Sequence, residues 1–351
     1  MNAPILATGR EWAGLPDQAY QHTPGQGPPR PGLRLHVVVP ALNEERTIAE
    51  VIRAIPREIP GVRDVEVVVV DDGSTDRTKE EARGAQARVV SHPAPRGVGA
   101  AFHTGLNDGI ERGADLLVSI DADGQFDPRD IPSLVAPVIT RQADFATASR
   151  FKDPLLTPSM PRLKLWGNKL MSRLISRLAG RRFFDVSCGF RCYSRRAVLN
   201  LHLLGGFTHT QEVFMNLAFK QLAIVEVPLR VRGVRKYGDS RVADSLLKYA
   251  LRTSRIIFRC YRDYHPLRFF GAMALMLIVP AFLSGLFLLW HYLTTGGFSP
   301  HKWAGFAAGA LLALGLMMLH MGMIGDMLAR HRIYLEELLY HRRAEIHRRG
   351  D

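Results

Sequence analysis

Residues Val65–Thr78 read VEVVVVDDGSTDRT, and the fold class can be predicted from this stretch outward. The first six residues are apolar except for Glu66, which is typical of a strand buried on both faces of a sheet. Two acidic residues, a glycine turn and the start of a helical pattern follow directly. The stretch therefore predicts a strand that feeds a helix in a parallel sheet.

Three further apolar runs have the same character: LHVVVP at 35–40, LLVSI at 116–120 and ADFATA at 143–148. Stretches of helical period, ERTIAEVIRAI and GAAFHTGLNDGI, alternate with them. This alternation predicts an α/β fold with a Rossmann-like, mostly parallel sheet and flanking helices. We also expect a helix around 165–178 and a strand at 223–227.

Composition narrows the class of protein. The chain has 351 residues, with 46 Lys and Arg against 33 Asp and Glu, a net charge of +13. With 47% hydrophobic and 23% charged residues it is not disordered as a whole. Its three cysteines give no disulfide framework and favour a reducing compartment. Residues 1–33 are rich in Pro and Gly, lack a signal-peptide core and are expected to be a disordered tail.

Two long apolar runs, at 269–289 and 303–319, predict two transmembrane helices. The loop between them is nearly uncharged, whereas arginines flank the pair on both sides. By the positive-inside rule, the soluble domain and both termini are expected in the cytoplasm. Glycines in the second run permit close helix packing and self-association as a homo-oligomer.

A basic stripe precedes the first run, at steps of four, three, four and three residues: Lys248, Arg252, Arg255, Arg259 and Arg262. Such spacing predicts a helix in the headgroup layer that meets anionic lipid or a phosphate ligand, with a solvated helix face as the alternative. The expected division is therefore a 34–243 soluble domain, a 244–267 juxtamembrane helix, a 268–328 transmembrane pair and a solvated, basic 329–351 tail. Because the charge flanks the apolar runs, nucleic acid is not expected as a partner.

Polar residues stand where the predicted strands end. Asn43 follows the first strand, where it can cap the next helix, and Ser74 and Asp76 are expected to cap the one after. Asp72 leaves the second strand, where a carboxylate can read a base or ribose. No GxGxxG follows either strand, which disfavours a nicotinamide dehydrogenase.

The stretch LLVSIDADGQFDP, 116–128, carries the strongest chemical signal. Asp121 and Asp123 leave the same strand two residues apart, and Gln125 adds a neutral oxygen. Mg²⁺ takes few protein carboxylates and completes its shell with phosphate oxygens and water, so the stretch predicts a metal–diphosphate site. Asp127 before Pro128 has a simpler role as a helix cap.

Basic residues can clamp a diphosphate that a metal only partly neutralises. Arg150 ends a predicted strand, and residues 235–241, RKYGDSR, form a basic loop around a glycine. The segment DVSCGF, 185–190, lies between them. Cys188 and Cys192 have no second Cys or His pair within reach, so zinc is not expected.

Together, these motifs resemble glycosyltransferase family 2 with the GT-A fold, and more closely its polyprenyl-phosphate and dolichyl-phosphate hexosyltransferases. The resemblance implies a nucleotide site at Pro40, Leu42, Glu44, Val70, Asp72 and Ala122. It implies an Mg²⁺ or Mn²⁺ site at Asp121, Asp123 and Gln125. Phosphates of donor or acceptor would contact Arg150, Arg235, Ser240 and Arg241. Asp185 would be the catalytic residue beside the acceptor phosphate, orienting it or accepting a proton.

The resemblance also sets the expected reaction, which is inverting transfer of a hexose from a UDP- or GDP-sugar to a polyprenyl phosphate at the membrane. Many members have Tyr where this chain has Leu42, which weakens base stacking. The Q-x-x-R-W motif of processive members is absent, which disfavours a polysaccharide synthase. Two alternatives stay open, a membrane-anchored nucleotide-sugar-binding regulator without turnover and a family 2 transferase with another acceptor.

Overall fold

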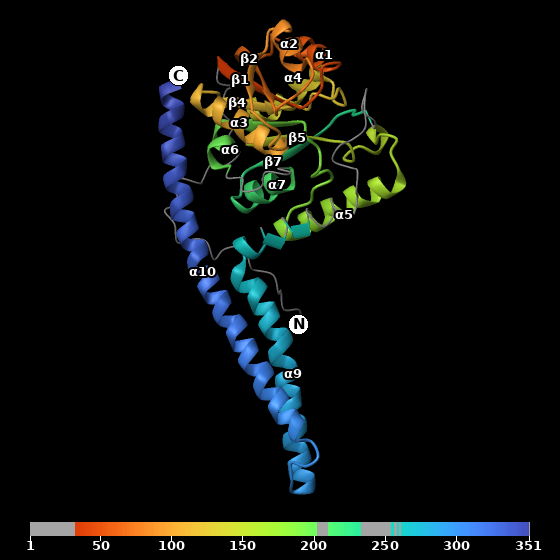
Figure 1. Ribbon diagram of the computed structural model, residues 1–351, viewed down its shortest axis with the longest axis vertical. Helices are drawn as coiled ribbons and strands as arrows, with labels where there is room; N and C mark the ends of the chain where they lie inside the picture. The colour runs from red at the N-terminus through yellow and green to blue at the C-terminus, as the bar shows by residue number, and fades with distance from the viewer. Residues whose placement is uncertain (1–31, 202–209, 233–253, 256–257, 260, 351) are drawn as a thin grey trace, which may run out of the picture.

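The computed structural model describes residues 32–201, 210–232, 254–255, 258–259 and 261–350. Its soluble part is an α/β domain, from which two long helices project (Figure 1). The strands are β1 (Leu33–Ala41), β2 (Val62–Asp71), β3 (Arg88–Ser91), β4 (Leu116–Ser119), β5 (Phe145–Ser149), β6 (Arg191–Ser194) and β7 (Ile224–Pro228). The soluble helices are α1 (Ile48–Ala54), α2 (Thr78–Gly84), α3 (Val98–Glu111), α4 (Ile131–Ile139), α5 (Arg162–Ala179), α6 (Arg195–Asn200) and α7 (Thr210–Phe219), with single 3₁₀ turns η1 (Pro128–Asp130) and η2 (Pro154–Leu156).

The strands form one sheet in the order β3-β2-β1-β4-β6-β5-β7. Strand β6 runs antiparallel to β4 and β5, and the other pairs are parallel. The register sets Pro40 opposite Val70 and Ala41 opposite Asp71, so β1 and β2 end side by side. The loops that follow β1, β2 and β4 therefore meet at the carboxyl ends of the strands. We call this the joined edge of the sheet, and open α/β sheets usually bind their ligands there.

Two apolar layers sandwich the sheet. Helices α1, α2 and α4 contribute to one layer, and α3, α5, α6 and α7 to the other. Within β1, Val37 and Val39 belong to the first layer and Val38 to the second, as expected for alternating side chains of a strand buried on both faces. The predicted mostly parallel α/β sheet is confirmed.

Two short strands were not predicted, β3 and β6. Strand β6 begins with Arg191, which is completely buried. Its guanidinium donates to the carbonyls of Val186 and Cys188 and lies over the rings of Phe145 and Phe214. A buried cation with these partners is compatible with a core strand, but in the sequence it interrupts the apolar run.

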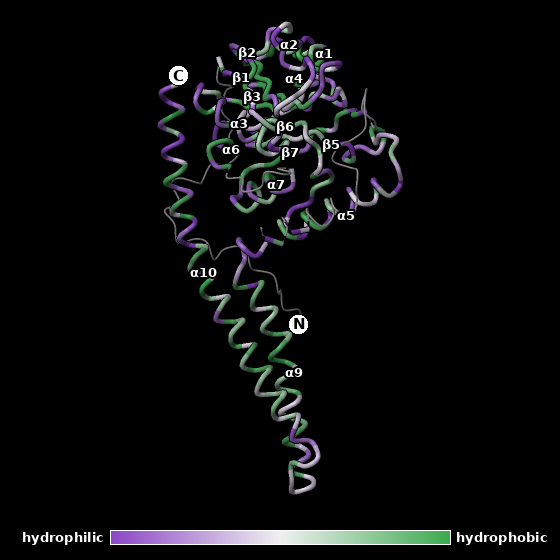
Figure 2. The backbone as a smooth tube through the Cα atoms, viewed as in Figure 1, coloured by the Kyte–Doolittle hydropathy of each residue, from purple (hydrophilic) through white to green (hydrophobic). Residues whose placement is uncertain are grey.

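Two helices are long and apolar enough to cross a membrane, α9 (Pro266–Thr295) and α10 (Lys302–Gly350). They lie side by side and are mostly hydrophobic along the shared length (Figure 2). The α10 glycines allow this close approach, because a Cβ on Gly315, Gly322 or Gly325 would lie within 3.1 Å of α9 atoms. These glycines thus serve packing within the pair.

The end of α10 differs from the solvated tail that we expected. The helix continues to residue 350 beside the soluble domain (Figure 1). Glu336 pairs with Lys220 at 3.1 Å, Arg343 donates to the Leu201 carbonyl at 2.7 Å, and His347 Nε2 lies 2.8 Å from the Ala114 carbonyl oxygen. His347 is buried. The prediction of a solvated tail was wrong, because side chains on one face of this charged helix form hydrogen bonds and an ion pair with the soluble domain.

Candidate active site

The loops after β1 and β2 are tied to one another. Ser74 Oγ accepts from the Asn43 amide, and Asn43 Oδ1 accepts from the Thr75 amide, both at 2.8 Å. Asn43 adopts a left-handed backbone (φ 51°), which Asn tolerates better than most residues. Asn43 and Ser74 therefore join the two loops and do not cap helices as predicted; α1 begins five residues after Asn43.

The predicted nucleotide residues lie at this joined edge. Pro40 and Val70 are buried neighbours in adjacent strands, and the Asp72 amide donates to the Ala41 carbonyl at 2.8 Å. Leu42 and Glu44 lie in the loop between β1 and α1, and the Glu44 amide donates to Thr78 Oγ1 at 2.8 Å. The structure thus brings these five residues to one edge, and Ala122 is buried in the loop after β4. The contacts of all six with a nucleotide stay a prediction.

The Asp72 carboxylate organises a third loop, between β3 and α3. Its oxygens accept from the amides of Arg96 and Gly97 at 2.9 and 2.7 Å, and His92 Nδ1 lies 2.7 Å from Oδ1. His92 Nε2 lies 2.9 Å from Thr104 Oγ1 on α3. Asp72 therefore fixes the shape of this edge from a buried position. Sequence reasoning missed His92, because its role depends on a contact between β2 and β3.

The acidic loop after β4 has its two carboxylates held in different ways. Asp123 is buried, and its Oδ1 accepts from the Gln125 amide at 3.0 Å across a turn in which Gly124 is left-handed (φ 71°). Asp121 lies against Gly189, where an added Cβ would lie 2.7 Å from Asp121 Oδ2. Only glycine at 189 leaves this space to the carboxylate.

A divalent cation fits the chemistry of this loop. Asp121, Asp123 and the side-chain oxygen of Gln125 supply hard oxygen donors, and Gly189 leaves the space that the Asp121 carboxylate occupies. No group of three or more His, Cys, Asp or Glu that could hold a metal occurs among the described residues. A site with so few protein ligands suits Mg²⁺, which retains water and phosphate oxygens in its shell.

Arg150 and Asp185 form a buried bidentate ion pair. Arg150 Nε and a terminal guanidinium nitrogen donate to the two Asp185 oxygens at 2.6 and 2.8 Å, and the Arg150 amide donates at 3.1 Å. Asp185 is fully buried and Arg150 is 12% exposed. In this arrangement Asp185 holds Arg150 in position. Its predicted catalytic role, and the phosphate contact predicted for Arg150, stay predictions.

Glu226 of β7 binds the backbone next to this ion pair. It accepts from the amides of Phe184 and Asp185, at 2.9 and 2.7 Å. Burial raises the pKa of the Glu226 carboxyl, although these backbone hydrogen bonds act in the opposite direction. The carboxylate thus orders the turn that carries Asp185. This contact could not be predicted, because Glu226 lies inside an otherwise ordinary strand.

Lys164, in the first turn of α5, is a further basic residue of the site. Burial lowers the pKa of its ammonium group, and Arg150 lowers it further, while Asp123 acts to raise it. The charges of the acidic loop and of the buried ion pair therefore both act on the Lys164 ammonium group. It was not singled out from the sequence, where it is one of many basic residues on an amphipathic helix.

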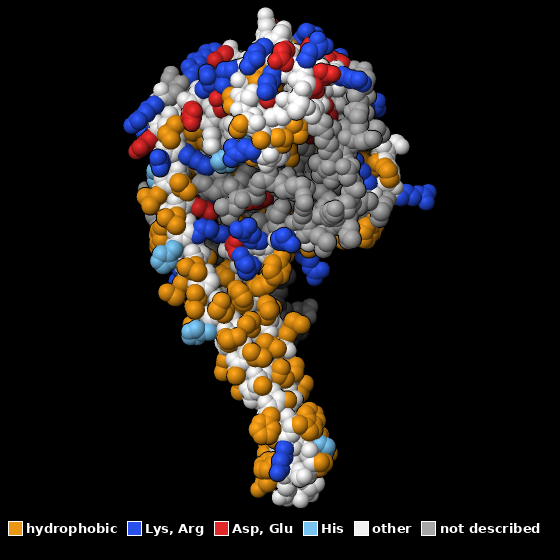
Figure 3. All heavy atoms as spheres, in the orientation of Figure 1, with side chains coloured by type: hydrophobic (Ala, Val, Ile, Leu, Met, Phe, Trp, Pro, Cys, Tyr) orange, Lys and Arg blue, Asp and Glu red, His pale blue; other side chains and the backbone are white. Residues whose placement is uncertain are grey.

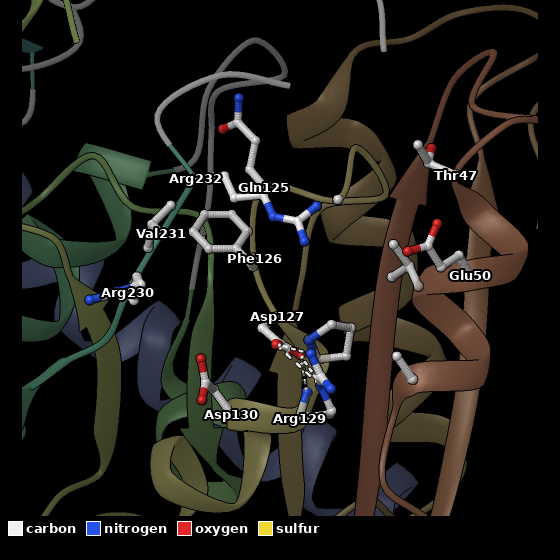
Figure 4. A pocket seen from close by; sticks show the side chains of 14 residues that line it. Thr47, Glu50, Gln125, Phe126, Asp127, Arg129, Asp130, Arg230, Val231 and Arg232 are labelled. Atoms are coloured by element: carbon white, nitrogen blue, oxygen red, sulfur yellow. Dashed lines mark hydrogen bonds and ion pairs between the residues drawn. The ribbon is translucent and has the colours of Figure 1, made fainter. Parts of the chain in front are cut away.

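A cavity of about 680 Å³ opens beside the acidic loop, between α1, residues 124–130 and residues 230–232 (Figure 4). Glu50 and Arg232 approach it from opposite walls. Asp127 caps η1 as predicted, and its hydrogen bond from Arg129 lowers the pKa of the Asp127 carboxyl. The Arg232 amide donates to the Gln125 carbonyl at 3.0 Å, so this wall is tied to the acidic loop. Three predicted phosphate contacts, Arg235, Ser240 and Arg241, lie outside the described residues.

Comparison with known proteins places these observations in a family. Residues 36–201 match the family described as Glycosyl transferase family 2. The UDP-N-acetylglucosamine–dolichyl-phosphate N-acetylglucosaminyltransferase of Methanococcus voltae is 31% identical over 56% of this chain and 84% of that protein. The dodecaprenyl-phosphate galacturonate synthase of Rhizobium johnstonii is 29% identical over 87% of this chain and 90% of that protein.

A solved structure shares the fold. Glucosyl-3-phosphoglycerate synthase from Mycobacterium tuberculosis, crystallised with Mg²⁺ and uridine diphosphate, is 26% identical with a TM-score of 0.52, over 65% of this chain and 79% of that one. The matched part of this chain holds the joined loops, the acidic loop and the buried ion pair described above. On sequence and on fold alike, the chain belongs to glycosyltransferase family 2.

Proposed function

We propose that this glycosyltransferase transfers a hexose from a UDP- or GDP-sugar to a polyprenyl phosphate at the membrane surface, with inversion at the anomeric carbon. The names of the Methanococcus voltae and Rhizobium johnstonii relatives, which specify dolichyl phosphate and dodecaprenyl phosphate, support this acceptor class. The two apolar helices α9 and α10 support a membrane location. We place the soluble domain and both termini in the cytoplasm, as the flanking arginines indicate.

The surface of helix α5 is the feature that most favours a lipid acceptor. One face exposes Trp166, Leu170 and Leu174, which are 60%, 45% and 40% exposed at four-residue steps. The helix contains no acidic residue and five basic ones: Arg162, Lys164, Lys169, Arg173 and Arg177. An apolar stripe flanked by basic side chains, with a Trp on it, is typical of a helix in the interface of an anionic membrane. In Figure 1, α5 lies on the side of the domain from which α9 departs.

The same helix connects this surface to the site. Its first turn carries Lys164, whose pKa is raised by the charge of Asp123 and lowered by that of Arg150. Trp166 is exposed two residues later. A lipid phosphate at the level of α5 would therefore be near the acidic loop and the buried ion pair. A soluble acceptor would need no such surface, which is why we favour the lipid.

The reaction needs little proton transfer. A phosphate oxygen of the acceptor attacks the anomeric carbon, the bond from that carbon to the diphosphate oxygen breaks, and nucleoside diphosphate leaves. The nucleophile is already anionic, so positioning and charge neutralisation dominate. Mg²⁺ or Mn²⁺, held by Asp121, Asp123 and Gln125, would supply positive charge to the departing diphosphate.

Other residues have proposed roles in binding. The nucleotide would lie on the loops of Pro40, Leu42, Glu44, Val70, Asp72 and Ala122. Arg150, Arg235, Ser240 and Arg241 would contact phosphates of donor or acceptor. Asp185 would orient the acceptor through Arg150, or accept a proton if the phosphate arrives monoprotonated.

A donor screen tests the proposal. Purified protein receives Mg²⁺, a polyprenyl phosphate and, separately, radiolabelled UDP-glucose, UDP-N-acetylglucosamine or GDP-mannose. We expect label in the organic phase from one donor and its loss in Asp123→Ala. Asp153→Ala is the matched control, because that aspartate caps η2 away from the cavity, and it should keep most of the activity. Binding of nucleotide without label from any of a wide donor panel would instead favour the regulator.

A further inference from the structure

The end of α10 lies beside the soluble domain, outside the hydrocarbon core of the membrane. Asp, Glu, Lys and Arg are absent from residues 303–325 and resume at Asp326, so the apolar span of α10 ends near Gly325. At about 1.5 Å per residue, Glu336 lies about 17 Å beyond Gly325 and His347 about 33 Å. Figure 3 shows Lys and Arg side chains gathered where the apolar pair of helices meets the domain.

One face of this segment makes the contacts with the domain. Tyr340 and Ala344 pack against the apolar layer to which α3, α5, α6 and α7 contribute. The polar contacts of Glu336, Arg343 and His347 lie on the same face, because the five positions recur at steps of three or four residues. They reach the end of α7, the residue after α6 and the segment before β4. We call residues 336–347 the strut.

A second attachment of the domain lies at the start of α9. Asn216 of α7 donates to the Tyr264 hydroxyl at 2.9 Å, and the rings of Phe219 and Tyr264 lie 4.5 Å apart between centres. The Arg332 guanidinium of α10 lies 3.9 Å from the centre of the Tyr264 ring. From Arg332 to His347 the helix rises about 22 Å. The domain is thus held at two separate places, which prevents the pivoting that a single joint would allow.

The strut is attached to the strand that carries the acidic loop. His347 is 2% exposed, and its Nε2 lies 2.8 Å from the carbonyl oxygen of Ala114, two residues before β4. Asp121 follows the other end of β4. A contact at the start of this strand therefore fixes the position of the acidic loop relative to the membrane helices.

We propose that Arg343 and His347 are positioning residues, which hold the strut against the domain and so set the height and tilt of the site relative to the bilayer. The inference rests on the proposed function for its acceptor, since the phosphate of a membrane lipid stays at the level of the headgroups. A domain that pivoted about Tyr264 would meet this phosphate correctly in a smaller fraction of its orientations. A soluble acceptor reaches the site in every orientation, so the strut favours the acceptor held in the membrane.

Double electron–electron resonance on the full-length protein in nanodiscs tests the strut without turnover. Nitroxide labels at Arg83→Cys on α2 and Arg330→Cys on α10 report how the domain is oriented relative to α10, since both positions are exposed. The parent protein carries Cys260→Ser, and the two remaining native cysteines are buried. We expect a single narrow distribution of distances in the parent.

Two pairs of substitutions separate the strut from a general effect of charge. Arg343→Glu with His347→Glu should widen the distribution at least about twofold, because two carboxylates then face carbonyl oxygens. His341→Glu with Arg342→Glu is the matched control, with the same replacements at exposed positions of the same helix, and should leave the distribution unchanged. The milder Arg343→Ala with His347→Ala should widen it in the same direction. Retained nucleotide binding shows that the domain of each variant is folded.

A kinetic measurement compares two acceptors. Arg343→Glu with His347→Glu should raise the KM for polyprenyl phosphate in nanodiscs about tenfold and leave the KM for geranyl phosphate, a short water-soluble analogue, unchanged. An unchanged distance distribution in this variant, the same widening in the control pair, or an equal rise of both KM values would each overturn the proposal. The distance measurement needs no turnover, so it decides the role of the strut even if the donor screen gives no product.

Discussion

The ion pair between Asp185 and Arg150 shows how a motif residue can act through another. Asp185 has no exposed surface, and its two oxygens accept from the Arg150 guanidinium. From the sequence, the two residues were separate candidates for two separate contacts. The structure joins them into one unit, in which the carboxylate fixes the plane and position of the cation.

Asp185→Asn is predicted to lower both stability and turnover. Removing one charge of a buried pair costs about 3–5 kcal/mol, so we expect a lower thermal midpoint and at least a tenfold loss of kcat/KM. Arg150→Lys should lower turnover by a similar factor, because an ammonium cannot donate in a bidentate manner. The pH profile of Asp185→Asn should keep its shape if the carboxylate only positions Arg150. Undiminished turnover in Asp185→Asn would remove Asp185 from the mechanism.

Gly189→Ala is predicted to disable the acidic loop without unfolding the protein. The new methyl group would lie 2.7 Å from Asp121 Oδ2, so the carboxylate must move. We expect the Mn²⁺ concentration that gives half-maximal transfer to rise at least tenfold in a metal titration, with little change in the thermal midpoint. Gly84→Ala is the control, since a Cβ there meets nothing within 4 Å. Equal activity of the two variants would argue against a metal role for Asp121.

The continuous apolar runs predicted β1, β2, β4 and β5, and the polar residues at the end of a predicted strand located the acidic loop. The contacts that complete the site were beyond prediction, because they join segments distant in sequence. Gly189 packs against Asp121, and the charge of Asp123 acts on Lys164, only once β6 and α5 have packed on the sheet. Strand β6 was not predicted because Arg191 interrupts its apolar run. Two of the Arg191 guanidinium nitrogens donate to carbonyls that only the folded chain brings near.

Helix α5 is predicted to determine affinity for the lipid acceptor. Trp166→Glu and Leu170→Glu place charge on its exposed apolar face and should raise the KM for polyprenyl phosphate about tenfold, with an unchanged KM for the nucleotide sugar. Arg255→Glu and Arg259→Glu, at exposed positions before α9, should act in the same direction. Arg83→Glu on α2, exposed on another side of the domain, is the control. Equal effects on both substrates would contradict this role.

A charge network joins β1, β2, β3 and α3 at the end of the sheet opposite the site. His36 lies 3.0 Å from Asp108 and 3.5 Å from Glu66, and Arg88 pairs with both carboxylates. Burial acts to lower the pKa of His36, but hydrogen bonds to Asp108 and Glu66 outweigh it and raise the pKa. The pKa of Glu66 falls to about 2, chiefly through His36; that of Asp108 also falls to about 2, where hydrogen bonds from His36 and Arg88 outweigh burial.

This network predicts a stability maximum between about pH 4.5 and 6.5. The lowered carboxyl pKa values stabilise the fold above about pH 4.5, and that contribution is lost as the pH falls toward 2. The raised pKa of His36 stabilises it below about pH 6.5, and that contribution is lost as the pH rises through the folded value. Thermal midpoints followed by circular dichroism in detergent should decline on both sides. His36→Gln should remove the alkaline decline; an unchanged alkaline slope would contradict the assignment.

We predict that this membrane-anchored family 2 transferase makes a glycosylated lipid monophosphate. The most direct test is product stoichiometry with the active donor, polyprenyl phosphate and, in parallel, soluble 3-phosphoglycerate. We predict equimolar nucleoside diphosphate and sugar-linked polyprenyl monophosphate by mass spectrometry, and no product from the soluble acceptor. Release of nucleoside monophosphate, or transfer to 3-phosphoglycerate in place of the lipid, would contradict this assignment of product and acceptor.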